Sequence, residues 1–398
     1  MHKQTPTVEW VVAKSEADWQ RLSIHRAHPP MSVHTFCYNR SVPMKIKGGV
    51  LLSSPRCCFH HLVVALAYVS LWRKPMENRL ELADRFVQAQ LAKRSDIIGA
   101  WVGGSTARGE ATEGSDIDIA LVIAGESGQS FGARDGVDGW QDGIYYDAVY
   151  LSASDFADLE TVMQNAFWAT HMNDGLLRYD PTGHFTQLQQ AVRAVYMQPP
   201  WLAKRLYYWL EVARIHVTGL QEAIATDNPL RISEHAGWAT FAFFSLPLLC
   251  RGITPSSTRG LIQLGTVAPG FQAQIYAFYC PGMLNTASVL ALEPLVREWL
   301  TLVDRAKWGQ LFDYSVHKAL WLAHQGEPQA AFYAMDIGGT IGADCQTDEA
   351  KAAQATALAQ RWLAAIHWTG QPVLAAKVVS AQLLLEQMET LVIDLKCW

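Results

Sequence analysis

The chain has 398 residues, of which 50% are hydrophobic and 17% are charged, and this is enough for two domains with a sizeable core. A net charge of −5 argues against general nucleic-acid binding through bulk electrostatics. The seven cysteines show no paired spacing typical of a zinc site or a disulfide framework, which favours a reduced, cytoplasmic setting.

Residues 1–75 differ from the rest of the chain in charge and in pattern. They hold ten Lys/Arg and only three Asp/Glu residues, and prolines and glycines interrupt any periodicity. We expect a poorly ordered extension here; the alternatives are a basic arm that binds nucleic acid or acidic partners, and an unfamiliar accessory element. A domain is predicted to begin at Met76.

No membrane segment is expected. Residues 1–10 lack the apolar run of a secretory signal, and the longest apolar runs, 62–72 and 238–250, are too short to span a bilayer. Both runs are predicted to be buried helices.

The first elements after Met76 are predicted from their hydrophobic spacing. A helix is expected over 77–93 and a strand over 97–102. The strand leads into a Gly-Gly-Ser turn, after which residues 106–110 are expected to form a short helix. The run 117–123 is rich in Ile and Val and predicts a buried strand.

Two aspartates, Asp116 and Asp118, stand one residue apart at the start of that strand. Side chains alternate across a strand, so both carboxylates should point to the same face, where they repel each other unless a cation lies between them. Mg²⁺ is the hard cation that carboxylates bind together with substrate phosphates. The turn Gly103-Gly104-Ser105 precedes this pair, and glycine backbone can approach phosphate oxygens closely. The pattern indicates a metal site beside a phosphate cradle.

A third carboxylate, Asp147, lies in the middle of a strand predicted over 144–151. A buried carboxylate needs a partner, and the alternative is an edge-strand aspartate that faces water. Before this strand, the turn-rich stretch 125–143 is expected to flex partly over the site. After it, we expect a helix with Asp155 and Asp158 in its first turn, capped by Ser154.

The domain is predicted to close with a strand near 175–179 and a helix over 184–197, before Pro199-Pro200 marks a boundary. Beyond it the pattern is almost entirely helical, which favours a bundle. Helices are expected near 201–225, 234–250, 270–278, 286–308, 310–324, 351–368 and 373–395. The run 337–342 is glycine-rich but lacks the lysine of a phosphate-binding loop, and we interpret it as a linker.

Gly104-Ser105, about ten intervening residues and Asp116-x-Asp118 on a strand resemble the signature of the nucleotidyltransferase superfamily, which includes DNA polymerase beta and the antibiotic-modifying adenylyltransferases. The residues around the motif are similar to its bacterial minimal and antibiotic-modifying branch, and the resemblance is strong over 76–185. It implies an α+β fold: a nucleotidyltransferase α/β domain with a small mixed sheet at 76–198, then an α-helical, acceptor-binding domain at 199–398.

The resemblance implies a function and a set of site residues. The function is Mg²⁺-dependent transfer of a nucleoside monophosphate, AMP from ATP or the equivalent from another nucleoside triphosphate, to a hydroxyl of a small-molecule acceptor, with release of pyrophosphate. An antibiotic is the leading example of the acceptor, and the many tryptophans and the acidic remainder of the chain suit a cationic ring system. Asp116, Asp118 and Asp147 are the implied catalytic residues and the ligands of one or two Mg²⁺ ions, and the implied nucleotide-binding residues are Gly103, Gly104, Ser105, Arg108 and Ser115.

Several alternatives stay open at this point. Arg108 is expected to contact phosphate or to form a salt bridge with Glu110 or Glu113. The general base is Asp147 or a carboxylate of the helical part, for instance Glu211. The acceptor could instead be a protein, as in toxin–antitoxin pairs, or the domain a catalytically silent nucleotide-binding module. An oligomer is left open; a nucleic-acid substrate and a membrane partner are not expected.

Overall fold

The structure is a computed structural model that describes residues 79–125, 137–280, 284–304, 308, 310–336 and 348–396. The predictions for residues 1–75, for the linker at 337–342 and for most of the stretch 125–143 lie outside these residues. No helix in the described ranges combines the length and the apolar character needed to cross a membrane.

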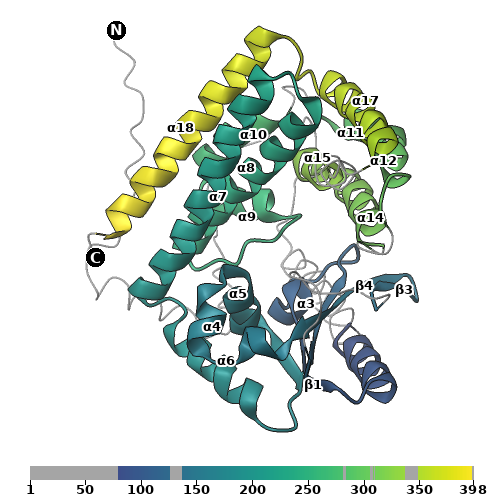
Figure 1. Cartoon of the computed structure of the whole chain (residues 1–398), viewed down its shortest axis with the longest axis vertical. Coiled ribbons are helices and arrows are strands. Elements are labelled where there is room, and N and C mark those ends of the chain that lie inside the picture. The colour runs from purple at the N-terminus through teal and green to yellow at the C-terminus, as the bar shows by residue number, and fades with distance from the viewer. Residues whose placement is uncertain are drawn as a thin grey trace, which may run out of the picture. The chain divides into compact units, whose positions relative to one another are not determined.

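A small mixed sheet organises the first half of the described chain (Figure 1). Its strand order is β3-β4-β2-β1-β5, in which β2 and β4 are parallel and the other neighbours are antiparallel. The strands are β1 (Ile97–Val102), β2 (Ile117–Ile123), β3 (Gly139–Gln141), β4 (Ile144–Ser152) and β5 (Leu176–Tyr179). The predicted α+β class with a small mixed sheet is therefore confirmed.

Alternating side chains of β2 bury both faces of the sheet. Ile117, Ile119 and Leu121 join one core, which also contains Leu82 and Val87 of a helix described over residues 79–93. Ala120 and Val122 join the opposite core. That second core is covered by α4 (Leu159–Gln164), α5 (Ala166–Asp174) and α6 (His184–Val195). The sheet is thus covered by helices on both faces, and its central strand carries the predicted aspartates.

Local differences from the predictions have local causes. The short helix after the Gly-Gly-Ser turn, α3, spans Gly104–Arg108, so it begins earlier than residue 106. Strand β3 was not predicted, because it has three residues, of which two are exposed. The helix cap predicted at Ser154 is wrong: residues Ala153–Phe156 form a 3₁₀ turn, and the Asp158 side chain caps α4 by accepting a hydrogen bond from the Thr161 N–H at 2.8 Å.

The second half of the described chain is helical. It contains α7 (Pro199–Ala225), α8 (Pro229–Cys250), α9 (Gly260–Val267), α10 (Pro269–Tyr279), α11 (Thr286–Leu290), α12 (Glu293–Leu300), α14 (Leu311–His324), α15 (Pro328–Met335), α17 (Glu349–Ala365) and α18 (Gln371–Lys396). A short loop joins α7 to α8, which pack side by side (Figure 1). The single helix predicted over 286–308 is instead α11 and α12, because Pro294 starts a new helix after the turn at Ala291.

Candidate active site

Asp116, Asp118 and Asp147 come together at one end of the two parallel strands. Asp118 lies in β2 directly opposite Asp147 in β4, and Asp116 immediately precedes β2. One carboxylate oxygen of each residue lies within 4.8 Å of the others. Parallel pairing in register brings residues distant in sequence to the same point of the sheet, so the cluster follows from the strand arrangement.

The electrostatics of this cluster favour a bound cation. Burial, and secondly the negative charge of Asp147, raises the pKa of Asp116 to about 6, although the positive charge of Lys318 opposes the shift. Burial, followed by the charges of Asp116 and Asp147, raises the pKa of Asp118 well above its usual range. Three partly buried carboxylates are costly to ionise together, and carboxylate oxygens are the ligands that Mg²⁺ prefers. The donor set therefore fits a hard divalent cation.

The Gly-Ser turn packs directly against the aspartates. Gly104 has a φ of +58°, a left-handed conformation that glycine adopts readily. The backbone N–H of Gly103 donates to the Asp118 carbonyl at 2.8 Å. Because position 104 lacks a Cβ, the turn approaches the Asp118 carboxylate closely, and Ser105 faces the same cavity.

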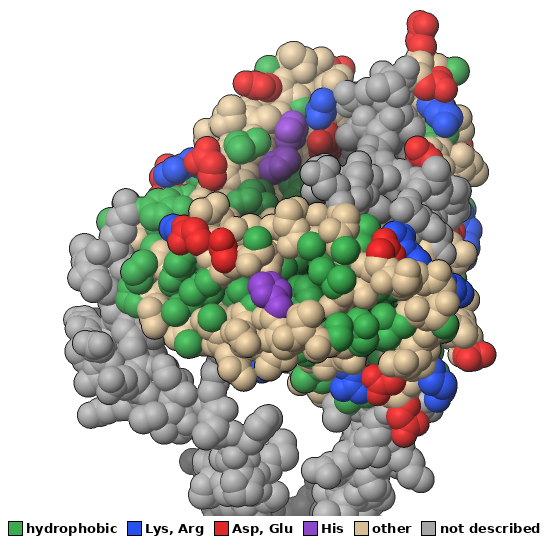
Figure 2. Space-filling model, turned by 60° about the horizontal axis from the view of Figure 1, so that its bottom comes forward, with side chains coloured by type: hydrophobic (Ala, Val, Ile, Leu, Met, Phe, Trp, Pro, Cys, Tyr) green, Lys and Arg blue, Asp and Glu red, His purple; other side chains and the backbone are tan. Residues whose placement is uncertain are grey.

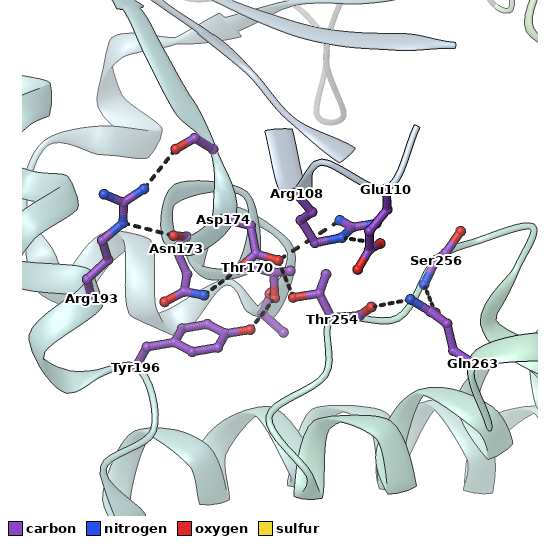
Figure 3. A network of polar contacts seen from close by, with 12 residues as sticks. Arg108, Glu110, Thr170, Asn173, Asp174, Arg193, Tyr196, Thr254, Ser256 and Gln263 are labelled. Atoms are coloured by element: carbon purple, nitrogen blue, oxygen red, sulfur yellow. Dashed lines mark hydrogen bonds and ion pairs between the residues drawn. The ribbon is translucent and has the colours of Figure 1, made fainter. Parts of the chain in front are cut away.

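Arg108 at the end of α3 belongs to a polar network beside the cluster (Figure 3). Its Nε lies 2.9 Å from a Glu110 carboxylate oxygen, and its Nη1 lies 4.0 Å from Asp174. Asp174 also accepts a hydrogen bond from the Thr254 hydroxyl in the helical part of the chain. Of the salt-bridge alternatives raised by the sequence, the pair with Glu110 is present, and the guanidinium still lines the cavity.

All eight site residues that the sequence suggested line one cavity of about 290 Å³. They are Gly103, Gly104, Ser105, Arg108, Ser115, Asp116, Asp118 and Asp147. The Ser115 hydroxyl is engaged within its own turn, since it accepts from the Thr112 N–H at 2.9 Å. Glu211, suggested as an alternative base, is not among the lining residues: its side chain is 61% exposed and pairs with Arg214.

The rest of the cavity wall comes from residues that the sequence did not single out. They include the aromatic residues Phe167, Trp168, Trp209 and Phe241, the hydroxyl-rich segment 254–258, and Arg259, Tyr314 and Lys318. His171, interpreted from sequence as an ordinary polar residue, lines the cavity too, and burial lowers its pKa to about 4. Its imidazole is therefore neutral at pH 7. No local motif marks these residues, because they reach the site only through tertiary packing.

Comparison with known proteins agrees with this geometry. Residues 84–167 match the family model described as a nucleotidyltransferase domain, a range that contains the Gly-Ser turn and all three aspartates. A solved nucleotidyltransferase-like protein from Exiguobacterium sibiricum 255-15 is 11% identical, with 51% of this chain and 68% of that chain covered; its TM-score of 0.29 is too low to carry an argument. No curated protein matches the chain. Residues 84–167 are therefore assigned to a nucleotidyltransferase domain, in agreement with the geometry of the carboxylate cluster.

Proposed function

We propose that the protein transfers AMP from ATP to a hydroxyl of a small-molecule acceptor and releases pyrophosphate. The observation that carries this proposal is the placement of three carboxylates within 4.8 Å of one another, in the same cavity as the Gly104-Ser105 turn. A cation site and a phosphate cradle side by side are what transfer of a nucleoside monophosphate requires.

Asp116, Asp118 and Asp147 would hold one or two Mg²⁺ ions, which would supply positive charge to the phosphate oxygens. We assign the triphosphate to the side of the Gly-Ser turn, where the backbone at Gly104 and the Ser105 hydroxyl line the cavity. Arg108 adds positive charge there, since its pairing with Glu110 leaves further N–H donors on the guanidinium.

The proposed reaction is an in-line displacement at the α-phosphorus. The acceptor hydroxyl oxygen forms a bond to this phosphorus, while the bond to the oxygen that bridges the α- and β-phosphates breaks. Pyrophosphate leaves with that electron pair. The hydroxyl proton passes to a carboxylate in the cleft, and Asp147 is our candidate for this general base because it lines the cavity beside the other two aspartates.

We infer that the acceptor binds against the part of the wall formed by the helical half of the chain. This part presents Trp209 and Phe241, from α7 and α8, and the hydroxyl-rich segment 254–258. Aromatic faces and hydroxyls suit a ring-containing acceptor with hydrogen-bonding groups. The cavity volume, about 290 Å³, is close to the smallest volumes of about 300 Å³ found for small-molecule sites.

The charged side chains on one face of the molecule bear on a nucleic-acid acceptor. On the face that Figure 2 shows, the Lys and Arg side chains of the described residues are scattered, several of them near Asp and Glu, and form no continuous basic stripe. Nucleic-acid binding relies on such stripes.

A screen with radiolabelled nucleotides tests the proposal. The protein is incubated with Mg²⁺, each of the four nucleoside triphosphates labelled at the α-phosphate, and a panel of hydroxyl-bearing small molecules, including aminoglycosides and neutral sugars. We expect label from ATP on one class of small molecule, with equimolar pyrophosphate. Label on a protein would support the protein-acceptor alternative, and no turnover with any donor and acceptor would support the silent module.

A further inference from the structure

Residues 112–116 form a loop that leads into β2 and ends with Asp116. Helix α14, which lies outside the sheet, contacts this loop. The hydroxyl oxygen of Tyr314 accepts a hydrogen bond from the Asp116 backbone N–H at 3.1 Å. The same hydroxyl donates to the carbonyl oxygen of Gly114 at 3.2 Å. One phenol therefore bridges two backbone groups of the loop, and the residues that it joins lie 198 and 200 positions away in the sequence.

The ring of Tyr314 is itself fixed. It stacks on Tyr145 of β4 with ring centroids 4.8 Å apart and planes 12° apart, and it is buried. Since Tyr145 is two residues before Asp147 in the same strand, Tyr314 contacts the elements that carry two of the three aspartates. Stacking against β4 and burial therefore fix the position of the Tyr314 hydroxyl.

A second residue of α14 acts on the same carbonyl. The Nζ atom of Lys318 donates to Gly114 O at 2.8 Å, and its side chain is buried. Gly114 also lies against the Trp321 ring, so closely that a Cβ atom there would lie 2.4 Å from it. Successive turns of α14 therefore contact the loop through Tyr314, Lys318 and Trp321.

The loop is also held by a residue from the helix over residues 79–93. Arg79 donates to the carbonyl oxygens of Ser115 at 2.6 Å and of Thr112 and Glu113 at 3.0 Å each. Arg79 thus holds the loop carbonyls, whereas Tyr314 reaches the backbone N–H of the aspartate itself. The two sets of contacts differ in what they hold. Arg79 stabilises the shape of the turn at residues 112–115, and Tyr314 of α14 fixes the position of the Asp116 backbone.

We propose that Tyr314 is a positioning residue, which sets Asp116 in the carboxylate cluster with the support of Lys318, so that α14 of the helical half completes the cation site. This inference rests on the proposed metal-dependent transfer. It adds that the helical half contributes to the geometry of the cation site as well as to acceptor binding.

The test compares Tyr314→Phe, which keeps the stacked ring and removes the hydroxyl, with Tyr276→Phe. Tyr276 is a matched control, because its hydroxyl accepts a hydrogen bond from Gln272 in α10 and it does not line the cavity. Mn²⁺ binding to the nucleotide-free full chain is measured by calorimetry. We expect affinity about tenfold lower in Tyr314→Phe, roughly the effect of one lost hydrogen bond to a buried group, and no change in Tyr276→Phe.

Hydrogen–deuterium exchange reports on position without metal or turnover. Exchange of the peptide that contains residues 112–116 should be at least about fivefold faster in Tyr314→Phe and in Lys318→Met than in wild type. Lys377→Met is the control for Lys318, since Lys377 also donates to a backbone carbonyl, that of Ala277, and lies 5.1 Å from a tryptophan ring. Unchanged exchange in both α14 variants would overturn the proposal.

Kinetics separate positioning from nucleotide binding. With an acceptor identified, Tyr314→Phe should lower kcat about tenfold and leave KM for the nucleotide within about twofold, because the hydroxyl contacts the metal-binding residue and not the triphosphate. Folding of each variant is checked by its melting curve. Wild-type Mn²⁺ affinity in a folded Tyr314→Phe protein would contradict the proposal even if transfer is confirmed. Weaker Mn²⁺ binding with faster exchange would uphold it even if no acceptor is found.

Discussion

A Cβ atom on Gly104 would lie 1.7 Å from the Oδ2 atom of Asp118, so no side chain can occupy position 104 while that carboxylate keeps its place. The turn and the aspartate strand are therefore one packed unit. The close approach also explains why glycine precedes Ser105 here: a larger residue would displace either the turn or the Asp118 carboxylate.

The first prediction concerns this contact. Gly104→Ala should lower nucleotidyl transfer by about a hundredfold or more, because displacing a positioning element by about 1 Å has effects of that size. Gly183→Ala is the control, since Gly183 has a comparable φ of +75° but nothing within 4 Å of an added Cβ. Gly183→Ala therefore introduces the backbone strain of a positive φ without a steric clash. Equal activity of the two variants would show that the contact with Asp118 is irrelevant to transfer.

The second prediction concerns the guanidinium beside the cradle. Arg108→Met should raise KM for the nucleotide about tenfold with a smaller effect on kcat, because a charge-assisted contact to phosphate is lost. Arg94→Met serves as the control, as Arg94 pairs with Asp96 and does not line the cavity. Steady-state kinetics with varied nucleotide measures both constants. An unchanged KM would assign Arg108 to the network with Glu110 and Asp174 alone.

The third prediction concerns pH and a histidine pair between α7 and α8. The Nδ1 atoms of His216 and His235 lie 2.9 Å apart, so one ring must accept a hydrogen bond from the other. Burial, and then the neighbouring ring, lowers the pKa of His216 to about 4. Burial lowers the pKa of His235 as well; the charges of Glu234 and Glu222 oppose this shift, and that of Arg231 adds to it.

Proton uptake by the two histidines sets the direction in which the free energy of unfolding changes with pH. The unfolded chain binds protons on these rings below a pKa of about 6.5, whereas in the folded chain His216 stays neutral until about pH 4, so the free energy of unfolding should fall as pH drops through this window. Urea unfolding should show that the free energy of unfolding falls less between pH 7 and pH 5 in His216→Asn than in wild type. His324→Asn, on an exposed residue, should lose as much as wild type. The same loss in all three proteins would contradict this account.

The sequence predicted those parts of the fold and site that depend on local pattern. Strands β1 and β2 begin and end at the predicted residues, and the glycine turn and the Asp-x-Asp pair could be found because they lie within 16 consecutive residues, 103–118. Asp147 followed from its strand, and the parallel pairing of β2 with β4 places it opposite Asp118.

Residues whose roles depend on tertiary packing could not be predicted. Tyr314 and Lys318 lie about two hundred positions from the loop that they contact, and nothing in their helical context distinguishes them from core residues. Helix α9 was missed because Gly260 and Gly265 lower its helix propensity. Tyr314 and Lys318 form part of the cavity wall, so the side of the cavity that α14 lines is the part that sequence alone describes least.

The most direct test of the central claim is transfer of α-phosphate label from ATP by Asp116→Asn, measured beside wild type and Asp142→Asn with and without Mg²⁺. Asp142 is the control because it is exposed in the β3–β4 turn, at a φ of 53° that asparagine also tolerates. The account predicts Mg²⁺-dependent transfer by wild type and Asp142→Asn, and a loss of at least about a thousandfold in folded Asp116→Asn. Transfer by Asp116→Asn at the wild-type rate, or wild-type transfer that persists after chelation of Mg²⁺, would contradict it.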